Sequence, residues 1–402
     1  MRVAGASHRE AWLEVDLAAI VHNVATIRGT LPRGVALAGV VKANAYGHGL
    51  VPVGRALDGV ADVLCVATLD EGLELRAAGL GERILVLYPV PAAGLLEALH
   101  AGLELTVMSG EDARALWAAR ARIDRPGAAN APGRFAVHLA VDTGMARGGL
   151  LPAAVSGVAR DLATSPGITL AGIWTHLVSP GDATRSAAQV DDFGRAVDEL
   201  RLAGTSVPAR HVSASGGLFA ATAPDLELVR PGLAVYGVLD AELPVAGHRA
   251  AAAAALVPAM SLKARAVAYS EVPEGGTVGY GGRWRAARPS RVAILPLGYG
   301  DGVARDSQPG AEALVRGRRV PLVGIISMDA LAVDVTDTPG VGYDDEFVLL
   351  GRDGTERITA SDLARTRNTI AWEVLSGMSA RLGRVYYPAA GSGQSGSTPE
   401  GP

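Results

Sequence analysis

The chain has 402 residues, of which 49% are apolar and 19% are charged, and its formal net charge is −4. This composition supplies enough apolar side chains for a large hydrophobic core and excludes a wholly disordered chain. The slight acidity, with a pI near 6.1, argues against a protein that coats nucleic acid. The length predicts two or three domains.

The single cysteine, Cys65, excludes an intramolecular disulfide framework and a clustered cysteine metal site. It stands in the apolar run 63–67, which predicts a buried core position. The first 15 residues contain no apolar segment of the signal-peptide kind, and no apolar run reaches the ~18 residues of a membrane helix. These features predict a cytoplasmic protein.

Strand-like and helix-like segments alternate through the first part of the chain. Residues 17–31 carry apolar side chains at helical spacing, with Asp16 as the predicted N-cap. Short apolar runs predict eight strands at 36–41, 63–66, 84–87, 103–107, 135–141, 168–174, 210–212 and 226–229. Helix-like stretches lie between them at 70–78, 111–123, 152–164, 189–202 and 216–222.

Strands that alternate with helices indicate a parallel sheet, and eight such units predict an α/β TIM barrel over residues 16–248. A doubly wound open sheet is the alternative. No Gly-x-Gly-x-x-Gly motif opens the first helix after a strand, which disfavours the dinucleotide-binding form of that alternative.

After residue 249 the pattern becomes rich in short β-like runs separated by turn residues. The predicted strands are 260–269, 291–297, 314–323, 325–335 and 346–350, and only 361–364 and 369–376 are helix-like. This predicts a mostly-β C-terminal domain over residues 249–388, which the strand predicted at 11–15 is expected to join. The tail 389–402 is rich in Gly, Ser and Pro and is predicted to be disordered.

Lysine is scarce: of 37 basic side chains only Lys42 and Lys263 are lysines. Only lysine among the basic residues offers an amine that can form a Schiff base. Lys42 follows the first predicted barrel strand, and TIM-barrel chemistry takes place at the carboxyl ends of strands. Apolar surroundings there would lower the pKa of the amine and favour Schiff-base formation. A solvent-exposed lysine at a strand end is the alternative, which the scarcity of lysine disfavours.

The segment VVKANAYGHG at 40–49 resembles the cofactor-lysine signature of the alanine racemase family, barrel-type enzymes that use pyridoxal 5'-phosphate (PLP). The resemblance extends from about Trp12 to Tyr386. Its further blocks are VDTGMAR (141–147), TH (175–176), VRPG (229–232), YG (236–237), VGYG (278–281), GYGDG (298–302) and SMD (327–329). Each block alone is a weak indication, but together and in this order they are highly specific.

The resemblance implies PLP-dependent racemisation of a small amino acid, most simply L-alanine to D-alanine for peptidoglycan precursors. It implies two bases on opposite faces of the substrate, Lys42 and Tyr280. In the family this tyrosine comes from the partner subunit, together with the substrate-facing Met328 and Asp329, so a homodimer with shared sites is expected. A tyrosine needs nearby cations and a polar chain, here through His176, to act near neutral pH.

The resemblance also implies the cofactor contacts. Arg230 cannot readily give up its proton, so facing the pyridine nitrogen it would keep that nitrogen unprotonated and disfavour transamination. Arg147 would contact the phenolic oxygen of PLP and the substrate carboxylate. The phosphate would lie at Tyr46 and in the loops after strands seven and eight, at Ser215, Gly232 and Leu233. No metal site is expected. Structural roles, such as N-capping by Ser215 or an ion pair of Arg230, are the alternatives.

Three positions depart from the family pattern. Ala140 stands where the family has a lysine that is often carbamylated, so no carbamate can hold Arg147. Ala214 stands in HVSAS (211–215) where the family commonly has asparagine. Trp372 replaces the tyrosine of a Tyr-Glu pair near the phosphate. The catalytic pair is intact, so the alternatives left open are a racemase for another amino acid such as serine and a PLP-binding paralogue with little activity.

Overall fold

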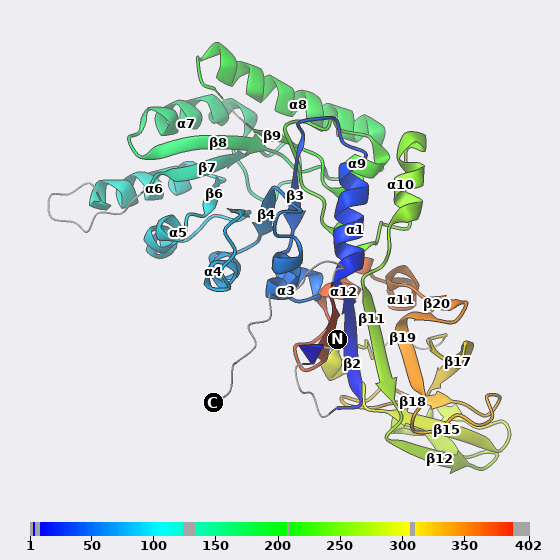
Figure 1. Ribbon diagram of the computed structural model, residues 1–402. Coiled ribbons are helices and arrows are strands. Elements are labelled where there is room, and N and C mark those ends of the chain that lie inside the picture. Colours follow the sequence, from blue (N-terminus) through cyan, green and yellow to red (C-terminus); the bar gives the residue numbers. More distant parts are fainter. Residues whose placement is uncertain (1–2, 5–8, 124–132, 207–208, 306–309, 389–402) are drawn as a thin grey trace, which may run out of the picture.

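The structure, a computed structural model, describes residues 3–4, 9–123, 133–206, 209–305 and 310–388. Figure 1 shows a barrel surrounded by helices above a mostly-β domain, and the chain enters the barrel from that domain through β2 (Ala11–Asp16) and α1 (Leu17–Arg28). Asp16 caps α1, since its Oδ1 accepts a hydrogen bond from Ala19 N at 2.9 Å. The predicted fold class is confirmed: an α/β barrel followed by a mostly-β domain.

Eight parallel strands form the barrel in the order β10-β3-β4-β5-β6-β7-β8-β9. A parallel bridge between Ala214 and Arg230 joins its two ends. The strands are nearly continuous apolar runs because helices cover their outer face. Their bounds are β3 (Ala36–Val40), β4 (Val63–Val66), β5 (Arg83–Val86), β6 (Glu104–Val107), β7 (Phe135–Ala140), β8 (Ile168–Trp174), β9 (Arg210–His211) and β10 (Leu228–Val229).

The outer helices follow the strands in sequence. They are α3 (Leu50–Ala56), α4 (Leu69–Ala77), α5 (Leu95–His100), α6 (Gly110–Ile123), α7 (Pro152–Thr164), α8 (Ala183–Leu202), α9 (Ser215–Ala220) and α10 (Ala250–Ala255). The sequence pattern did not predict α3 and α5, which are short and carry little apolar periodicity.

The C-terminal domain is built on one sheet, ordered β1-β21-β2-β11-β19-β16-β17-β18-β15-β12, with β20 paired to β19. β2 pairs antiparallel with β11 and parallel with β21. The bounds are β1 (Val3–Ala4), β11 (Met260–Arg265), β12 (Ala268–Val272), β15 (Ser290–Leu295), β16 (Glu312–Val315), β17 (Arg318–Val323), β18 (Leu331–Asp334), β19 (Glu346–Asp353), β20 (Glu356–Ile358) and β21 (Gly383–Tyr387).

Three predicted strands differ from the structure. The predicted strand 260–269 is divided between β11 and β12. The predicted strand 314–323 is the hairpin of β16 and β17, turned at Arg316 and Gly317, whose φ angles are 52° and 71°. The predicted strand 325–335 is regular only in β18, because residues 324–330 form a loop that carries Met328 and Asp329. The predicted disordered tail lies outside the described residues.

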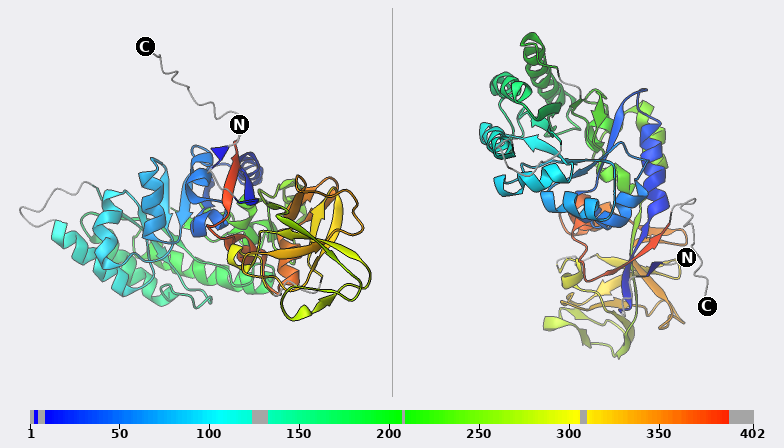
Figure 2. Two further views of the ribbon diagram at one scale, coloured as in Figure 1. Left: turned by 90° about the horizontal axis from the view of Figure 1, so that it is seen from below. Right: turned by 60° about the vertical axis from the view of Figure 1, so that its left-hand side comes forward.

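Two short helices, α11 (Ala360–Thr366) and α12 (Ala371–Ser376), lie between the barrel and the sheet (Figures 1 and 2). Arg384 Nε of β21 donates a hydrogen bond to Gly47 O at 2.8 Å, which ties the sheet to the segment that follows β3. The C-terminal domain therefore meets the barrel at the carboxyl ends of its strands.

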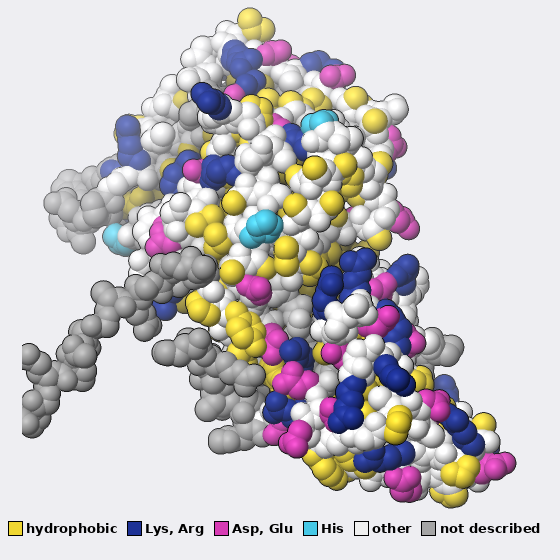
Figure 3. Space-filling model, turned by 45° about the vertical axis from the view of Figure 1, so that its right-hand side comes forward, with side chains coloured by type: hydrophobic (Ala, Val, Ile, Leu, Met, Phe, Trp, Pro, Cys, Tyr) yellow, Lys and Arg dark blue, Asp and Glu magenta, His cyan; other side chains and the backbone are white. Residues whose placement is uncertain are grey.

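Charged side chains of both signs are interspersed over the mostly-β domain on the face shown in Figure 3. Many are paired, as Arg316 Nε is with Asp345 Oδ1 at 2.7 Å. Within the described ranges, no helix is long and apolar enough to cross a membrane.

Candidate active site

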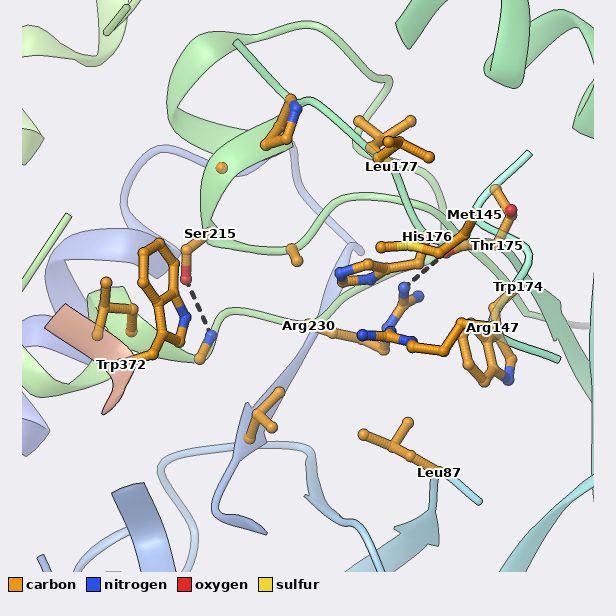
Figure 4. A pocket seen from close by; sticks show the side chains of 18 of the residues that line it. Leu87, Met145, Arg147, Trp174, Thr175, His176, Leu177, Ser215, Arg230 and Trp372 are labelled. Carbon is orange, nitrogen blue, oxygen red and sulfur yellow. Dashed lines mark hydrogen bonds between the residues drawn. The ribbon is translucent and has the colours of Figure 1, made fainter. Parts of the chain in front are cut away.

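A cavity of about 670 Å³ opens at the carboxyl ends of the barrel strands (Figure 4). This is the end at which TIM barrels carry their chemistry. Loops after several strands line it, and α12 of the C-terminal domain contributes Trp372. The structure brings together here Lys42, Tyr46, Arg147, His176, Ser215, Arg230, Gly232, Leu233 and Trp372, with Ala140 and Ala214 among them.

Lys42 lies two residues after the end of β3 and is partly buried. Burial lowers the pKa of its amine, and the positive charge of Arg147 lowers it further, while the carboxylate of Glu71 acts in the opposite sense. A lowered pKa leaves more of the amine in its unprotonated, nucleophilic form near neutral pH.

The backbone after Lys42 is left-handed. Ala43, Asn44, Ala45 and Tyr46 have φ angles between 52° and 54°. Each non-glycine residue in this conformation costs about 1–2 kcal/mol. Four in a row are therefore costly, and the surrounding structure must hold them. Strain of this kind concentrates at functional sites, and here it lies between two side chains of the cavity.

Arg230 follows β10 and is 3% exposed. Its Nη1 donates to His211 O at 2.8 Å and to His211 Nδ1 at 2.7 Å, and its Nη2 donates to Thr175 O at 2.8 Å. Burial lowers the pKa of the guanidinium to about 10, so it remains a cation at neutral pH. Trp174 lies 5.0 Å away, measured from its ring centroid to Arg230 Cζ. The guanidinium is thus fixed in place beneath the cavity.

A chain of hydrogen bonds connects Arg230 to a distant carboxylate. His211 Nδ1 faces an Arg230 N–H and must accept, so His211 carries its proton on Nε2 and donates to His138 Nδ1 at 2.9 Å. His138 then donates from Nε2 to Glu104 Oε2 at 2.8 Å. Arg83 pairs with the other oxygen of Glu104 at 2.5 Å. Burial holds the pKa of His211 well below its usual value, so its imidazole is neutral near pH 7.

Glu104 and His138 were not predicted as members of the site. Glu104 begins β6 and His138 lies within β7, and both side chains are buried in mostly apolar strands. Buried polar side chains need partners. A polar residue within a fully buried strand was therefore the feature that could have identified them.

The residues predicted to bind the phosphate of PLP lie around the start of α9, and this part of the cavity is called the phosphate end. Ser215 Oγ accepts hydrogen bonds from Gly232 N at 2.9 Å and from Ala234 N at 3.2 Å, which joins the loops after β9 and β10. A Cβ atom at Gly232 would lie 2.5 Å from the Tyr46 hydroxyl oxygen, so only glycine allows this approach. Burial raises the pKa of Tyr46 to about 12, which keeps its hydroxyl protonated and able to donate.

Arg147 lies in the loop after β7, which Asp142 shapes by accepting from Gly144 N at 2.9 Å and Ala146 N at 3.0 Å. Among the described residues, no hydrogen bond or ion pair holds the Arg147 guanidinium. Ala140, at the end of β7, offers it no polar atom. Arg147 is therefore a cation of the cavity without a fixed counter-ion in the part of the chain that the structure describes.

His176 follows β8, and in Figure 4 it lies near Arg147 and Arg230. Burial, and then the charge of Arg230, lower the pKa of His176 to about 3, so its imidazole is neutral at pH 7. A neutral imidazole can donate from one nitrogen and accept at the other. His176 can therefore carry a hydrogen bond to a phenol without adding charge.

Three predicted site residues do not line this cavity: Tyr280, Met328 and Asp329. Tyr280 stands in a turn of the C-terminal domain and is 69% exposed, and Met328 is 53% exposed. Asp329 is exposed and pairs with Arg381. Tyr299 N and Gly300 N hold the loop by donating to Ser327 O at 3.0 Å and Met328 O at 2.9 Å. The structure therefore presents these side chains on the surface of the same chain.

Trp372 comes from α12 and is partly buried at the end of the cavity that also holds Ser215 (Figure 4). Ser376 Oγ donates to Trp372 O at 2.7 Å and holds the short helix. The indole offers one N–H donor and no acceptor. It therefore brings a large apolar surface to a place where the family pattern has a phenol.

Comparisons with known proteins agree with this arrangement. The alanine racemase N-terminal domain matches residues 15–240 and the alanine racemase C-terminal domain matches residues 259–386. An alanine racemase of Symbiobacterium thermophilum is 38% identical over 383 residues, which cover 94% of this chain and 97% of that protein.

Solved structures agree as well. An alanine racemase of Clostridium difficile 630 superposes with a TM-score of 0.86 at 29% identity, covering 95% of this chain and 97% of that one. The biosynthetic alanine racemase from Pseudomonas aeruginosa gives a TM-score of 0.81 at 34% identity, covering 94% of this chain and 99% of that one. Both family domains occur in the same order along nearly the whole chain, which confirms the resemblance expected from the sequence, and the chain belongs to the alanine racemase family.

Proposed function

We propose that this enzyme of the alanine racemase family interconverts L- and D-alanine with PLP bound at Lys42, and that Tyr280 of a partner subunit is the opposing base. One observation carries the proposal. The amine of Lys42 lies at the mouth of the barrel, with a lowered pKa, in the cavity that also holds Arg230 and the Ser215–Gly232 contact.

The residues of the cavity fit PLP. Tyr46, Ser215 and the amides around Gly232 and Leu233 would hold its phosphate, because these groups can donate hydrogen bonds to an anion. Arg230 would face the pyridine nitrogen and, as a fixed cation, would not pass it a proton. When bound, PLP supplies an electron-withdrawing ring that acidifies the hydrogen on the α-carbon of the amino acid.

The chain's own residues would then position the substrate and move the proton. Arg147 would bind the substrate carboxylate, for which it has a free guanidinium. Lys42 would exchange the α-proton on one face and Tyr280 on the other, since inversion at carbon needs a proton acceptor and a donor on opposite faces. The neutral His176 would hydrogen-bond the phenol of Tyr280, and the cations Arg147 and Arg230 nearby would favour its ionised form.

The opposing base requires a second copy of the chain. Tyr280 and Met328 are exposed apolar side chains of the C-terminal domain, and neither lines the cavity of their own chain. A symmetric dimer would place this face over the barrel mouth of the partner, and the same contact would occur twice. We therefore propose a homodimer in which each site combines Lys42 of one chain with Tyr280, Met328 and Asp329 of the other.

Borohydride reduction of the PLP-loaded protein, followed by peptide mapping, tests the cofactor assignment. Reduction makes a PLP–lysine bond permanent, so the label should appear on the peptide that contains Lys42. Lys263 is a built-in control, because its Nζ is paired with Glu14 at 2.9 Å and Glu346 at 3.2 Å in the C-terminal sheet. Label on Lys263 alone, or no label at all, would overturn the proposal.

A second candidate function is racemisation of another small amino acid, such as serine. The observation that favours it is the pair of departures in the cavity lining, Ala140 and Trp372, which change the space and the polar groups offered to the substrate. Chiral chromatography of the products formed from a panel of L-amino acids distinguishes the two candidate functions. The highest kcat/KM with L-alanine supports the first function, and a higher value with L-serine supports the second.

A further inference from the structure

The carboxylate of Glu71 is bound to the backbone next to Lys42. Glu71 is in the first turn of α4, and its Oε1 accepts a hydrogen bond from Ala43 N at 2.6 Å. Its Oε2 accepts from Ala67 N at 2.7 Å and from Thr68 N at 3.3 Å. One carboxylate thus joins the residue after Lys42 to the end of the neighbouring strand β4.

The bond to Ala43 falls at the first residue of the left-handed run. Ala43 has φ 54° and ψ 52°, a conformation that a residue with a Cβ avoids. The rest of the run is held by other groups. Asn44 Oδ1 accepts from Leu50 N at 2.8 Å, and at the far end His48 Nδ1 lies 3.0 Å from the carbonyl oxygens of Ala45 and Tyr46. Glu71 is therefore the side chain that holds the end of the run nearest to the amine.

The run joins two side chains of the cavity. Lys42 precedes it, and Tyr46 is its last residue. If Ala43 relaxed to a right-handed or extended conformation, the chain would leave β3 in another direction and the lysine would move relative to the tyrosine. Both residues hold the cofactor in the proposed function, so the geometry of this run sets the spacing between the amine and the phosphate end.

We propose that Glu71 is a positioning residue for Lys42: its carboxylate fixes the left-handed backbone at Ala43, which directs the amine into the cavity. This inference rests on the proposed function for the role of Lys42. Burial and the positive charges of Arg147 and Arg230 lower the pKa of the Lys42 amine, and the carboxylate of Glu71 acts in the opposite sense.

Glu71→Gln, compared with Thr68→Ala, tests the proposal in the full-length protein. The amide keeps the size of the side chain but turns an NH₂ group toward at least one backbone N–H, whichever way it is oriented. Thr68→Ala is the matched control: it removes the cap of the same helix, where Thr68 Oγ1 accepts from Glu71 N at 3.4 Å, and leaves the carboxylate in place. Both variants weaken the start of α4, so thermal stability falls in both.

The affinity for PLP distinguishes Glu71→Gln from Thr68→Ala. Glu71→Gln should weaken binding of PLP by roughly ten-fold, the loss expected for one charge-assisted hydrogen bond. Thr68→Ala should leave the affinity unchanged. Adding Ala43→Gly to Glu71→Gln should restore most of the affinity, because glycine adopts positive φ without strain. Equal affinities of the two single variants, or no rescue by Ala43→Gly, would overturn the proposal.

A second readout needs no cofactor. The chain has only two lysines, so reductive ¹³C-methylation of the PLP-free protein gives one resonance each for Lys42 and Lys263. Glu71→Gln should shift the Lys42 resonance and lower the pKa of that amine, and Lys263 should not change. An unchanged Lys42 resonance would contradict the inference. Failure of the unmodified protein to bind PLP would instead contradict the proposed function, and the methyl resonances would still decide the role of Glu71.

Discussion

Arg230 is a buried cation that is linked to the carboxylate of Glu104 through two imidazoles, those of His211 and His138. Its other partners are backbone carbonyl oxygens, which are neutral. A cation held in this way cannot pass a proton to a neighbouring base. This property is what the proposed reaction requires opposite a pyridine nitrogen, since a protonated ring would delocalise charge further and favour transamination.

Arg230→Glu should therefore raise the ratio of transamination to racemisation and lower racemisation by about 10²-fold, the usual cost of removing one preorganised charged group. Pyruvate formed from L-alanine, measured beside D-alanine, gives the ratio. Arg230→Lys is the control, since it keeps a cation and loses only the planar fork. A ratio that does not differ between the two variants would contradict this role.

The indole of Trp372 leads to a second prediction at the residue scale. If its indole replaces a phosphate-binding phenol, Trp372→Tyr should tighten PLP binding by about 1–2 kcal/mol and raise turnover of alanine. Trp372→Phe lacks the hydroxyl and is the control. Both kcat and the PLP dissociation constant should be measured on alanine and serine. Equal kcat values and equal PLP dissociation constants for Trp372→Tyr and Trp372→Phe would show that the hydroxyl is irrelevant. A loss of activity on alanine with a gain on serine would instead make Trp372 a specificity residue.

The sequence pointed to single residues where their chemistry is rare, and the structure places several of these in one cavity. Lys42 is conspicuous because the chain has so few lysines, and Arg230 because its motif ends a strand. Glu104 and His138 were not predicted, because their hydrogen-bond partners come from other strands of the barrel. Such partners cannot be inferred from the spacing of nearby residues in the sequence. Glu71 was not predicted either, since its helix cap gives a sufficient local reason for a glutamate.

At the scale of elements, the barrel strands were predictable and the C-terminal strands less so. A strand buried on both faces is an uninterrupted apolar run, which is visible in the sequence. The hairpin of β16 and β17 was predicted as one strand because its turn, at Arg316 and Gly317, interrupts the apolar pattern only briefly. Residues 325–330 were predicted as strand because Ile325 and Ile326 are strand-like, but they belong to the loop that presents Met328.

Strands β6, β7 and β9 are joined by the buried pair Glu104 and His138, with His211 beyond it. Hydrogen bonds from His138 and Arg83 outweigh burial and lower the pKa of Glu104 to about 2, against 4.5 as its ordinary value. A carboxylate with a depressed folded pKa stabilises the fold above its unfolded pKa. That contribution is lost as the pH falls from about 4.5 toward 2.

Glu104→Gln should lower the free energy of unfolding by about 3 kcal/mol at pH 7, because it leaves the buried imidazole of His138 and the half-buried guanidinium of Arg83 without a charged partner. The difference from the unmodified protein should shrink below about pH 4.5, because Glu104 of the unmodified protein then binds a proton in the unfolded state but not yet in the folded state. Urea unfolding at pH 7, 5 and 4 measures both effects. A difference that is small at neutral pH, or that grows on acidification, would contradict the assignment.

At the scale of the whole molecule, the proposed catalytic groups are divided between two domains. Lys42, Arg147 and Arg230 belong to the barrel, whereas Tyr280 and Met328 belong to the mostly-β domain and face outward in their own chain. The resemblance to the family predicted this division. Residue spacing alone could not predict this division, because the spacing of residues within one chain does not identify the surface that contacts a second copy.

Mixing two inactive variants tests whether the two proposed bases of one site come from different subunits. The Lys42→Ala chain keeps its own Tyr280, and the Tyr280→Phe chain keeps its own Lys42. In a hybrid dimer these two residues meet in one complete site. A statistical mixture should regain up to about a quarter of the sites, since half of the dimers are hybrids with one good site in two. Subunit exchange can be verified with a tag on one variant. No recovery after verified exchange would mean that both bases belong to the same chain.

The central claim is that the chain racemises alanine, and the most direct test is to follow D-alanine by chiral chromatography after adding L-alanine to the PLP-loaded protein. The account predicts that L-alanine converts until the two enantiomers are equal, and that Lys42→Ala and Tyr280→Phe abolish or greatly slow the conversion. If the protein binds PLP and forms no D-alanine from L-alanine, the account is contradicted.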